Sequence, residues 1–133
     1  MNRYSPLGRG LLTGDIKKPE DLPEGDYRKH LPRFSKENFD NNVKLVNEVN
    51  KLAKEKGCTG AQIAVNWVKH MSKKDGNPEI IPIPGATTVE RILENVKEVS
   101  LSANDMEALD SILKQFPILG DRYDANTMKH SEV

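Results

Sequence analysis

The sequence predicts an α/β fold that is mostly helical, and three observations support this class. A short apolar run over residues 80–83, rich in β-branched residues, is stopped by Pro84-Gly85 and followed by a helix start, which is the strand–turn–helix pattern of α/β proteins. A second short strand is predicted before Ser5-Pro6. Apolar residues also recur at three- and four-residue steps in several longer stretches, as in helices that pack one face inward.

The predicted strand at the amino terminus is unusually short. Only Asn2, Arg3 and Tyr4 precede Ser5-Pro6, whereas a strand typically has about five or six residues. The strand therefore looks as though sequence upstream of it has been lost. Glycines follow at positions 8, 10 and 14, but an isolated Gly-x-Gly is weak support for phosphate binding.

Residues 15–38 are predicted to form a long irregular loop, because they contain three prolines and little periodicity. Loops of this length inside compact domains are often lids or binding loops. The segment also carries a small basic cluster, Arg28, Lys29, His30 and Arg33. A solvated polar loop and a binding loop are both compatible with this composition.

Helices are predicted from about Asn38 to the glycine at position 57, from Thr59, after the threonine pair at 87–88, and from Ser102. Thr59 with Gln62 and Ser102 with Asp105 have the spacing of a capping box. The second helix has a broad apolar face that includes Trp67, so we expect it to be well buried. Beyond Pro117 the chain becomes polar, and residues 124–133 are expected to be disordered or weakly docked.

The stretch after Pro84-Gly85 has the features of an anion-binding turn. Gly85 allows a ligand to approach the backbone, and the first N–H groups of the following helix are unpaired donors at the positive end of its dipole. Thr87 and Glu90 fit a capping box, with Thr87 at the cap. Such units are also common in α/β proteins that bind nothing there. The apolar residues of the helix share one face: Val89, Ile92, Leu93 and Val96.

Composition narrows the classes of function. Lys plus Arg and Asp plus Glu number 20 each and are interspersed, so nucleic acid and anionic membrane surfaces are disfavoured as partners. No apolar run approaches the length of a membrane span, and no signal segment opens the chain. With one cysteine, Cys58, an internal disulfide is impossible, so a reducing, cytoplasmic location is expected.

Catalytic and metal-binding patterns are not found in the sequence. The histidines at positions 30, 70 and 130 have no metal-ligand spacing from one another or from Cys58, so no metal site is predicted. No serine lies in a nucleophile elbow, and Cys58 has no partner histidine nearby. The residues alone therefore predict an anion-binding turn, a glycine-rich turn and a basic loop, without a catalytic group.

Two motifs in this order make the pattern specific: the segment from Tyr4 to Gly14, and the segment from Ile81 through Thr87 to Asn95. Together they closely resemble the carboxyl-terminal part of the aldo-keto reductase family, nearest to its fungal pyridoxal-reductase-like members. The resemblance implies the C-terminal portion of a (β/α)8 TIM barrel, with its last two strand–helix units and a capping helix. Residues 1–115 would form this partial domain, which includes a cofactor-covering loop at about 15–38. Residues 116–133 would form a polar tail.

The resemblance also implies a function: reduction of small aldehydes and ketones, with pyridoxal as one candidate, by hydride transfer from NADPH. The turn after the seventh barrel strand would line the nicotinamide and pyrophosphate, and the turn after the eighth would hold the adenosine and its 2′-phosphate. By motif, the implied cofactor-binding residues are Ser5, Pro6, Leu7, Gly8, Gly10, Arg33, Gly85, Thr87, Arg91, Glu94 and Asn95. Many relatives carry a lysine where this chain has Asp15, and Lys17 or Lys18 is a candidate substitute.

The family's catalytic tetrad of aspartate, tyrosine, lysine and histidine lies in the first half of the barrel, so no residue of this chain is predicted to be catalytic. A whole barrel of this kind needs about 250 residues. Three hypotheses follow. The chain could be the cofactor-binding part of a reductase that needs the N-terminal half of the barrel as its partner. It could instead be a non-catalytic nucleotide-binding or regulatory module, as the family's potassium-channel β subunits illustrate, or an inactive remnant.

Overall fold

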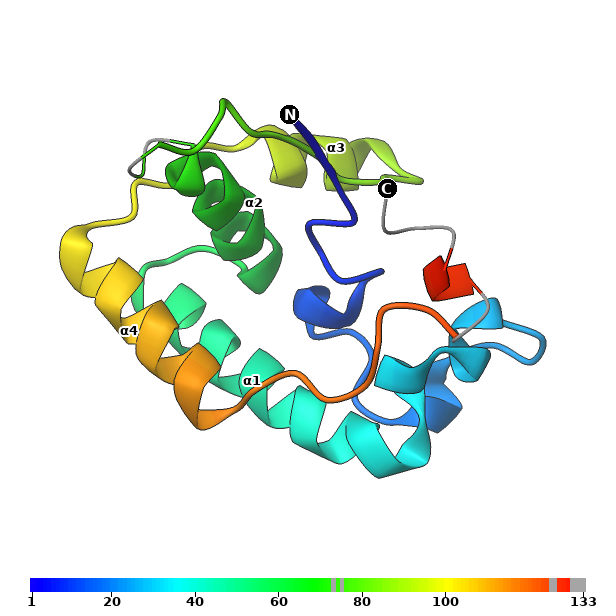
Figure 1. Ribbon diagram of the computed structural model, residues 1–133. Helices are drawn as coiled ribbons and strands as arrows, with labels where there is room; N and C mark the ends of the chain where they lie inside the picture. Colours follow the sequence, from blue (N-terminus) through cyan, green and yellow to red (C-terminus); the bar gives the residue numbers. More distant parts are fainter. Residues whose placement is uncertain (73, 75, 125–126, 130–133) are drawn as a thin grey trace.

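The computed structural model describes residues 1–72, 74, 76–124 and 127–129. Strands β1 (Asn2–Tyr4) and β2 (Ile81–Ile83) form a parallel pair, in which Asn2 faces Ile81 and Tyr4 faces Ile83. Helices α1 (Lys36–Glu55) and α2 (Gly60–Met71) lie between the strands in the sequence, and α3 (Val89–Val96) and α4 (Ala103–Gln115) follow β2 (Figure 1). Both predicted strands and all the predicted helices are confirmed.

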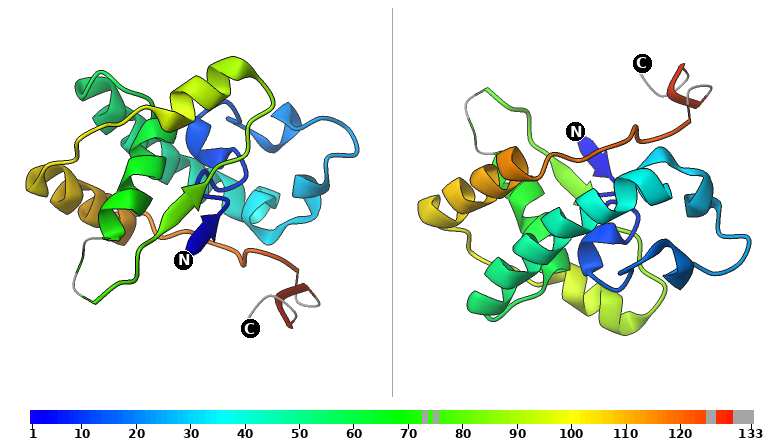
Figure 2. Two further views of the ribbon diagram at one scale, coloured as in Figure 1. Left: turned by 90° about the horizontal axis from the view of Figure 1, so that it is seen from above. Right: turned by 90° about the horizontal axis from the view of Figure 1, so that it is seen from below.

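The parallel pairing decides where the turns lie. Parallel neighbours need a long crossover, and here it contains α1 and α2. Both views of Figure 2 show the two strands side by side and running in one direction. The segments that follow them, residues 5–10 and 84–88, consequently emerge at the same end of the sheet. The two motifs singled out in the sequence are thereby brought together.

Capping hydrogen bonds set the helix boundaries, and one of the predicted caps is wrong. The boxes at Thr59 and Ser102 form as predicted, with each hydroxyl accepting from the backbone N–H three residues on at 3.2 Å. At α3 the cap is Thr88, whose hydroxyl accepts from the backbone N–H of Arg91 at 3.3 Å, and not Thr87. Either of two adjacent threonines can act as an N-cap, and the extended backbone of Thr88 selects it here.

The predicted loop is present, and its apolar side chains are packed into the core while most of its charged side chains are exposed. It winds through three short 3₁₀ helices, η2 (Pro19–Asp21), η3 (Tyr27–His30) and η4 (Pro32–Phe34). Its apolar side chains join those of α1 in one cluster, which contains Leu11, Ile16, Leu22, Leu31, Phe34, Phe39 and Val46. Burial of several large apolar side chains holds the loop in place.

A buried asparagine joins three distant segments. The side chain of Asn42, which is 0% exposed, donates to the carbonyls of Arg33 at 3.0 Å and Leu119 at 2.9 Å. Its oxygen accepts from the backbone N–H of Leu119 at 2.8 Å. Residues 117–123 are therefore docked along α1. The prediction for residues 124–133 falls largely on 125–126 and 130–133, which lie outside the described residues.

Helix α3 turns its polar side inward and its apolar stripe outward. Asn95 is its buried residue, whereas Val89, Ile92, Leu93 and Val96 are 51–65% exposed. Ile81 and Ile83 of the adjoining strand are about half exposed as well. The predicted one-sided pattern is therefore present, but these apolar side chains are not covered by the described part of the chain.

Replacing Asp105 with Asn should destabilise the chain in a pH-dependent way. Asp105 accepts from Lys56 Nζ at 2.7 Å and from Ser102, and these bonds hold its pKa at about 2. Such a lowered pKa stabilises the fold above the unfolded value of about 4, and this stabilisation is lost as the pH falls toward 2. Capping contacts contribute about 1 kcal/mol, so we expect the melting temperature of D105N at pH 7 to fall by roughly 3–5 °C.

The difference between D105N and the parent chain should narrow between about pH 4 and pH 2, as followed by circular dichroism melts. Asp110→Asn on the same helix is the matched control, because the oxygen of Asp110 lies 4.0 Å from Lys74 Nζ and both side chains are exposed. A difference for D105N that persists unchanged at pH 2 would contradict this account.

Candidate functional site

A cavity of about 1070 Å³ opens where the turns after β1 and β2 meet. Its size is slightly above the range of about 300–1,000 Å³ that is typical of pockets for small molecules and cofactors. Three segments line it: the turn at 4–16, the loop at 25–28, and the turn into α3. The lining residues are Tyr4, Ser5, Pro6, Leu7, Arg9, Gly10, Thr13, Asp15, Ile16, Gly25, Asp26, Tyr27, Arg28, Ile83, Gly85, Ala86, Thr87 and Arg91.

The first wall is a tightly wound turn after β1. Gly8 donates its N–H to the carbonyl of Ser5 at 3.0 Å, and Gly10 donates to that of Leu7 at 3.1 Å. Ser5 and Arg9 have positive φ values of 52° and 56°, which non-glycine residues rarely adopt. Strained backbone of this kind is common where a chain contacts a ligand.

The second wall combines a glycine and the amino terminus of α3. Because Thr88 takes the cap, Thr87 is left at the cavity surface beside Gly85 and Ala86. The unpaired N–H groups and positive dipole end of a helix start favour an anion. Arg91, the third residue of α3, adds a full positive charge in the first turn of the helix.

Arg28 fastens the loop over the first wall. Its guanidinium makes two parallel bonds to Asp26, with Nη2–Oδ2 at 2.6 Å and Nε–Oδ1 at 3.0 Å, and donates from Nη1 to the carbonyl of Arg9 at 2.9 Å. The Arg28 guanidinium lowers the pKa of Asp26 to about 2, and the carboxylate in turn raises the pKa of Arg28. Gly10 leaves room for this contact, since a Cβ there would lie 3.3 Å from Nη1.

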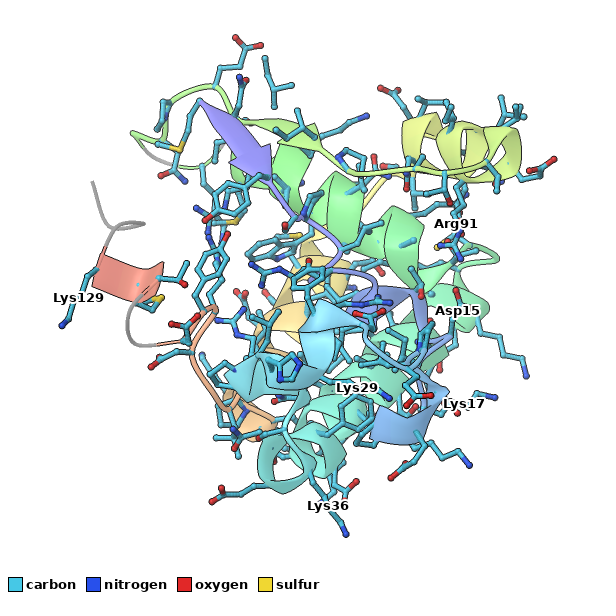
Figure 3. The ribbon with its side chains drawn as sticks, turned by 90° about the vertical axis from the view of Figure 1, so that its right-hand side faces the viewer. Asp15, Lys17, Lys29, Lys36, Arg91 and Lys129 are labelled. Carbon is cyan, nitrogen blue, oxygen red and sulfur yellow. The ribbon has the colours of Figure 1, made fainter. Side chains whose placement is uncertain are left out.

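An ion pair crosses the cavity between its two walls. Arg91 Nη2 lies 3.0 Å from Asp15 Oδ2, although the residues are 76 positions apart. The same carboxylate oxygen accepts from the hydroxyl of Thr13 at 3.0 Å. Figure 3 shows Arg91 reaching from α3 toward Asp15, with Lys17 and Lys29 on the same side of the molecule.

Most of the residues predicted to bind a cofactor line this cavity, and four do not. Gly8 is within the first turn but lines a smaller, mostly apolar cavity of about 240 Å³, as does Arg33, which donates to the carbonyl of Gly120 at 3.1 Å. Glu94 accepts from the hydroxyl of Thr59 at 2.6 Å. Asn95 donates to the carbonyl of Gly85 at 3.5 Å and so supports the second turn from behind.

Sequence reasoning missed several residues of the cavity: Arg9, Thr13, Tyr27 and Asp26, the partner of Arg28, which was predicted only as part of a basic cluster. One local signal could have identified the pair. Asp26 is the N-cap of η3 and accepts from the backbone N–H of Arg28 at 2.9 Å. An aspartate two residues before an arginine at a turn has this geometry available. Lys17 and Lys18, suggested as substitutes for the family's lysine, donate their backbone N–H groups to Asp21 and do not line the cavity.

The described residues contain neither a metal-binding cluster nor a membrane-spanning helix. No group of three or more His, Cys, Asp or Glu side chains there is arranged to hold a metal ion. None of the helices there is long and apolar enough to cross a bilayer.

Residues 2–114 match the sequence model of the aldo/keto reductase family, and so include the two strands, their turns and nearly all of the helices. The chain belongs to this family. Aldo/keto reductases are oxidoreductases built on the (β/α)8 barrel, and a parallel strand pair with helices between and after its strands is consistent with part of such a barrel.

Two relatives show the extent of the similarity. The chain is 42% identical over 130 residues to the "Putative pyridoxal reductase" of Saccharomyces cerevisiae, covering 91% of this chain and 38% of that protein. The glycerol dehydrogenase of Gluconobacter oxydans superposes with a TM-score of 0.72 and 30% identity, covering 89% of this chain and 35% of that one. The chain thus spans little more than a third of either relative.

Gly10→Ala should perturb the first wall more than a matched change in the loop. Gly10 and Gly25 both have positive φ, 88° and 78°, so alanine costs about 1–2 kcal/mol of backbone strain at either position. Open space surrounds Gly25, whereas a methyl at Gly10 would press on Arg28 Nη1. We expect G10A to lose about 1 kcal/mol more than G25A in denaturant titrations, through loss of the hydrogen bond from Arg28 to Arg9. Equal losses would show that Arg28 moves aside without cost.

Proposed function

We propose that the chain is the cofactor-binding, C-terminal part of an NADPH-dependent aldo-keto reductase, comprising the last two strand–helix units and the capping helix of the barrel. One observation carries the proposal: the cavity at the ends of both parallel strands is lined by a glycine turn, a helix amino terminus and Arg91. Active sites of (β/α)8 barrels lie at this end of the strands. A dinucleotide needs this combination of close backbone approach and positive charge.

The residues present fit a phosphorylated dinucleotide. Gly85 faces open space in the second turn, so a ligand can approach the backbone there, whereas the space beside Gly10 is taken by the Arg28 guanidinium that fixes the first turn. Ser5, Pro6, Leu7 and Gly10 would hold the nicotinamide and pyrophosphate end. Gly85, Thr87 and Arg91 would hold the adenosine and its 2′-phosphate. When bound, the cofactor supplies the hydride for reduction of a carbonyl.

The reaction we propose is reduction of a small aldehyde or ketone to an alcohol, with pyridoxal as a candidate substrate because of the similarity to the Saccharomyces relative. This chain supplies binding and orientation of the cofactor. The proton donor would come from the remaining barrel segments, and none of the predicted site residues is assigned that role. A cytoplasmic location agrees with the single cysteine, Cys58.

We propose the N-terminal part of the barrel as the partner. The apolar stripe of α3 and the half-exposed Ile81 and Ile83 of β2 support this, because these apolar side chains are left uncovered by the described part of the chain. In a closed barrel, each strand is paired on both edges and each strand–helix unit packs on its neighbours. The alternative, a nucleotide-binding module without catalysis, shares the cavity but needs no such covering.

Arg91→Ala should weaken NADPH binding. A ligand stabilises only the state that binds it, so NADPH in excess over its dissociation constant should raise the melting temperature of the parent chain. Loss of a charge-assisted contact to phosphate costs about 1.5–3 kcal/mol, or roughly ten- to a hundredfold in affinity. Arg3→Ala, an exposed residue of β1 outside the cavity, is the control and should bind as the parent does. An NADPH-insensitive melt of the parent would contradict the proposed function.

Mixing this chain with a polypeptide that carries the N-terminal three-fifths of the Saccharomyces relative should produce NADPH-dependent reduction of pyridoxal. Leu93→Glu, on the exposed apolar stripe, should prevent co-purification and activity, because a buried carboxylate without a partner is costly. Leu119→Glu is the control. Leu119 is 40% exposed and lies in residues 117–123 along α1, away from the stripe, so this variant should assemble normally. Co-purification without any reductase activity would favour the non-catalytic module.

A further inference from the structure

Among the residues that the structure describes, Asp15 is the acidic side chain that forms an ion pair with Arg91 of the proposed phosphate site. Its carboxylate and the guanidinium of Arg91 are 3.0 Å apart, and both side chains are substantially exposed, at 65% and 44%. Because the pair is exposed, it contributes little to stability. It nevertheless changes the charge that a ligand meets, since the positive charge of Arg91 is largely compensated by its neighbour.

From this arrangement we propose that Asp15 is a specificity-determining residue that weakens selection for the 2′-phosphorylated dinucleotide over the unphosphorylated one. The inference rests on the proposed function of the cavity. A 2′-phosphate bound to Arg91 would have to replace or share the Asp15 contact, and would place a dianion within a few ångströms of a carboxylate. An adenosine without the 2′-phosphate neither displaces Asp15 from Arg91 nor places a second negative charge beside the carboxylate.

The surroundings of Asp15 hold its carboxylate in place toward Arg91. The hydroxyl of Thr13 shares its proton between Oδ2 at 3.0 Å and the carbonyl of Gly10 at 2.8 Å, and the backbone N–H of Asp15 donates to the same hydroxyl at 3.3 Å. Across the described part of the chain, Arg91 is the one cation within ion-pair distance of Asp15. The carboxylate is therefore positioned before any ligand arrives, and it acts as a competitor for the phosphate rather than as a ligand for it.

Asp15→Asn tests this inference, because it removes the charge while keeping the shape and the ability to accept from Thr13. The probes are 2′,5′-ADP, which carries the 2′-phosphate, and 5′-AMP, which does not, titrated calorimetrically into the 133-residue chain. We expect D15N to raise the affinity for 2′,5′-ADP about three- to tenfold at low salt and to leave the affinity for 5′-AMP unchanged within about twofold. The gain should shrink near 1 M salt, where the Debye length is about 3 Å.

Two further variants separate charge from structure. Asp15→Glu keeps the carboxylate and should bind both nucleotides as the parent does. Asp110→Asn removes the same charge from α4 and should change neither affinity. The inference is overturned if D15N binds 2′,5′-ADP with unchanged or lower affinity, which would mean that Asp15 orients Arg91 for the phosphate. It is also overturned if D15E gains as much affinity for 2′,5′-ADP as D15N does. If the parent chain binds neither nucleotide, the proposed function fails, and this inference with it.

Discussion

The parallel pairing of β1 (Asn2–Tyr4) with β2 (Ile81–Ile83) is the constraint on which the site depends. The register sets Tyr4 beside Ile83, so the chain leaves both strands at one level and its two turns face each other. With antiparallel strands the same turns would lie at opposite ends of the sheet. A crossover that contains two helices is costly in loop-closure entropy, and burial along those helices offsets that cost.

The loop and the tail contribute to the site by fixing the first turn from outside. Arg28 reaches the carbonyl of Arg9 from the loop, and Arg9 in turn donates to the carbonyl of Arg122 at 2.9 Å. The Arg9 guanidinium also stacks over the ring of Tyr123, 4.4 Å from its centroid. A turn with strained residues keeps its shape only where its surroundings hold it. Buried Asn42 links the loop to the tail in the same way, by donating to the carbonyls of Arg33 and Leu119.

Local patterns were enough to predict the helices and the two turns from the sequence. Capping boxes at Thr59 and Ser102 and the strand stopped at Pro84-Gly85 depend on residues three or four positions apart, and these rules act within the chain itself. Selection of Thr88 over Thr87 could not be predicted, because both threonines satisfy the same local rule. The motif similarity assigned Ser5, Gly85 and Arg91 to one site, which spacing alone could not have joined.

Long-range contacts explain what the sequence could not predict. The predicted loop at 15–38 looks polar, yet Leu22, Leu31 and Phe34 are buried because α1 presents Phe39 and Val46 to them. Pairing of Asp15 with Arg91 likewise joins residues from different turns. Neither contact has a signature in local composition, since each depends on the three-dimensional path between its partners.

The two faces of α3 show how the site and its surroundings impose different requirements on one short helix. Its polar side is satisfied by Asn95 donating to Gly85 and by Glu94 accepting from Thr59, so hydrogen bonds hold the helix to the second turn and to the start of α2. Its apolar side contributes four half-exposed side chains, a contiguous stripe by helical spacing. Covering that stripe at about 25 cal/mol per Å² would stabilise the helix and, through it, the position of Arg91. Under the proposed function, affinity for the phosphate and assembly of the barrel would therefore be coupled through α3, because a partner that buries the stripe would also reduce the entropy that Arg91 loses when it binds an anion.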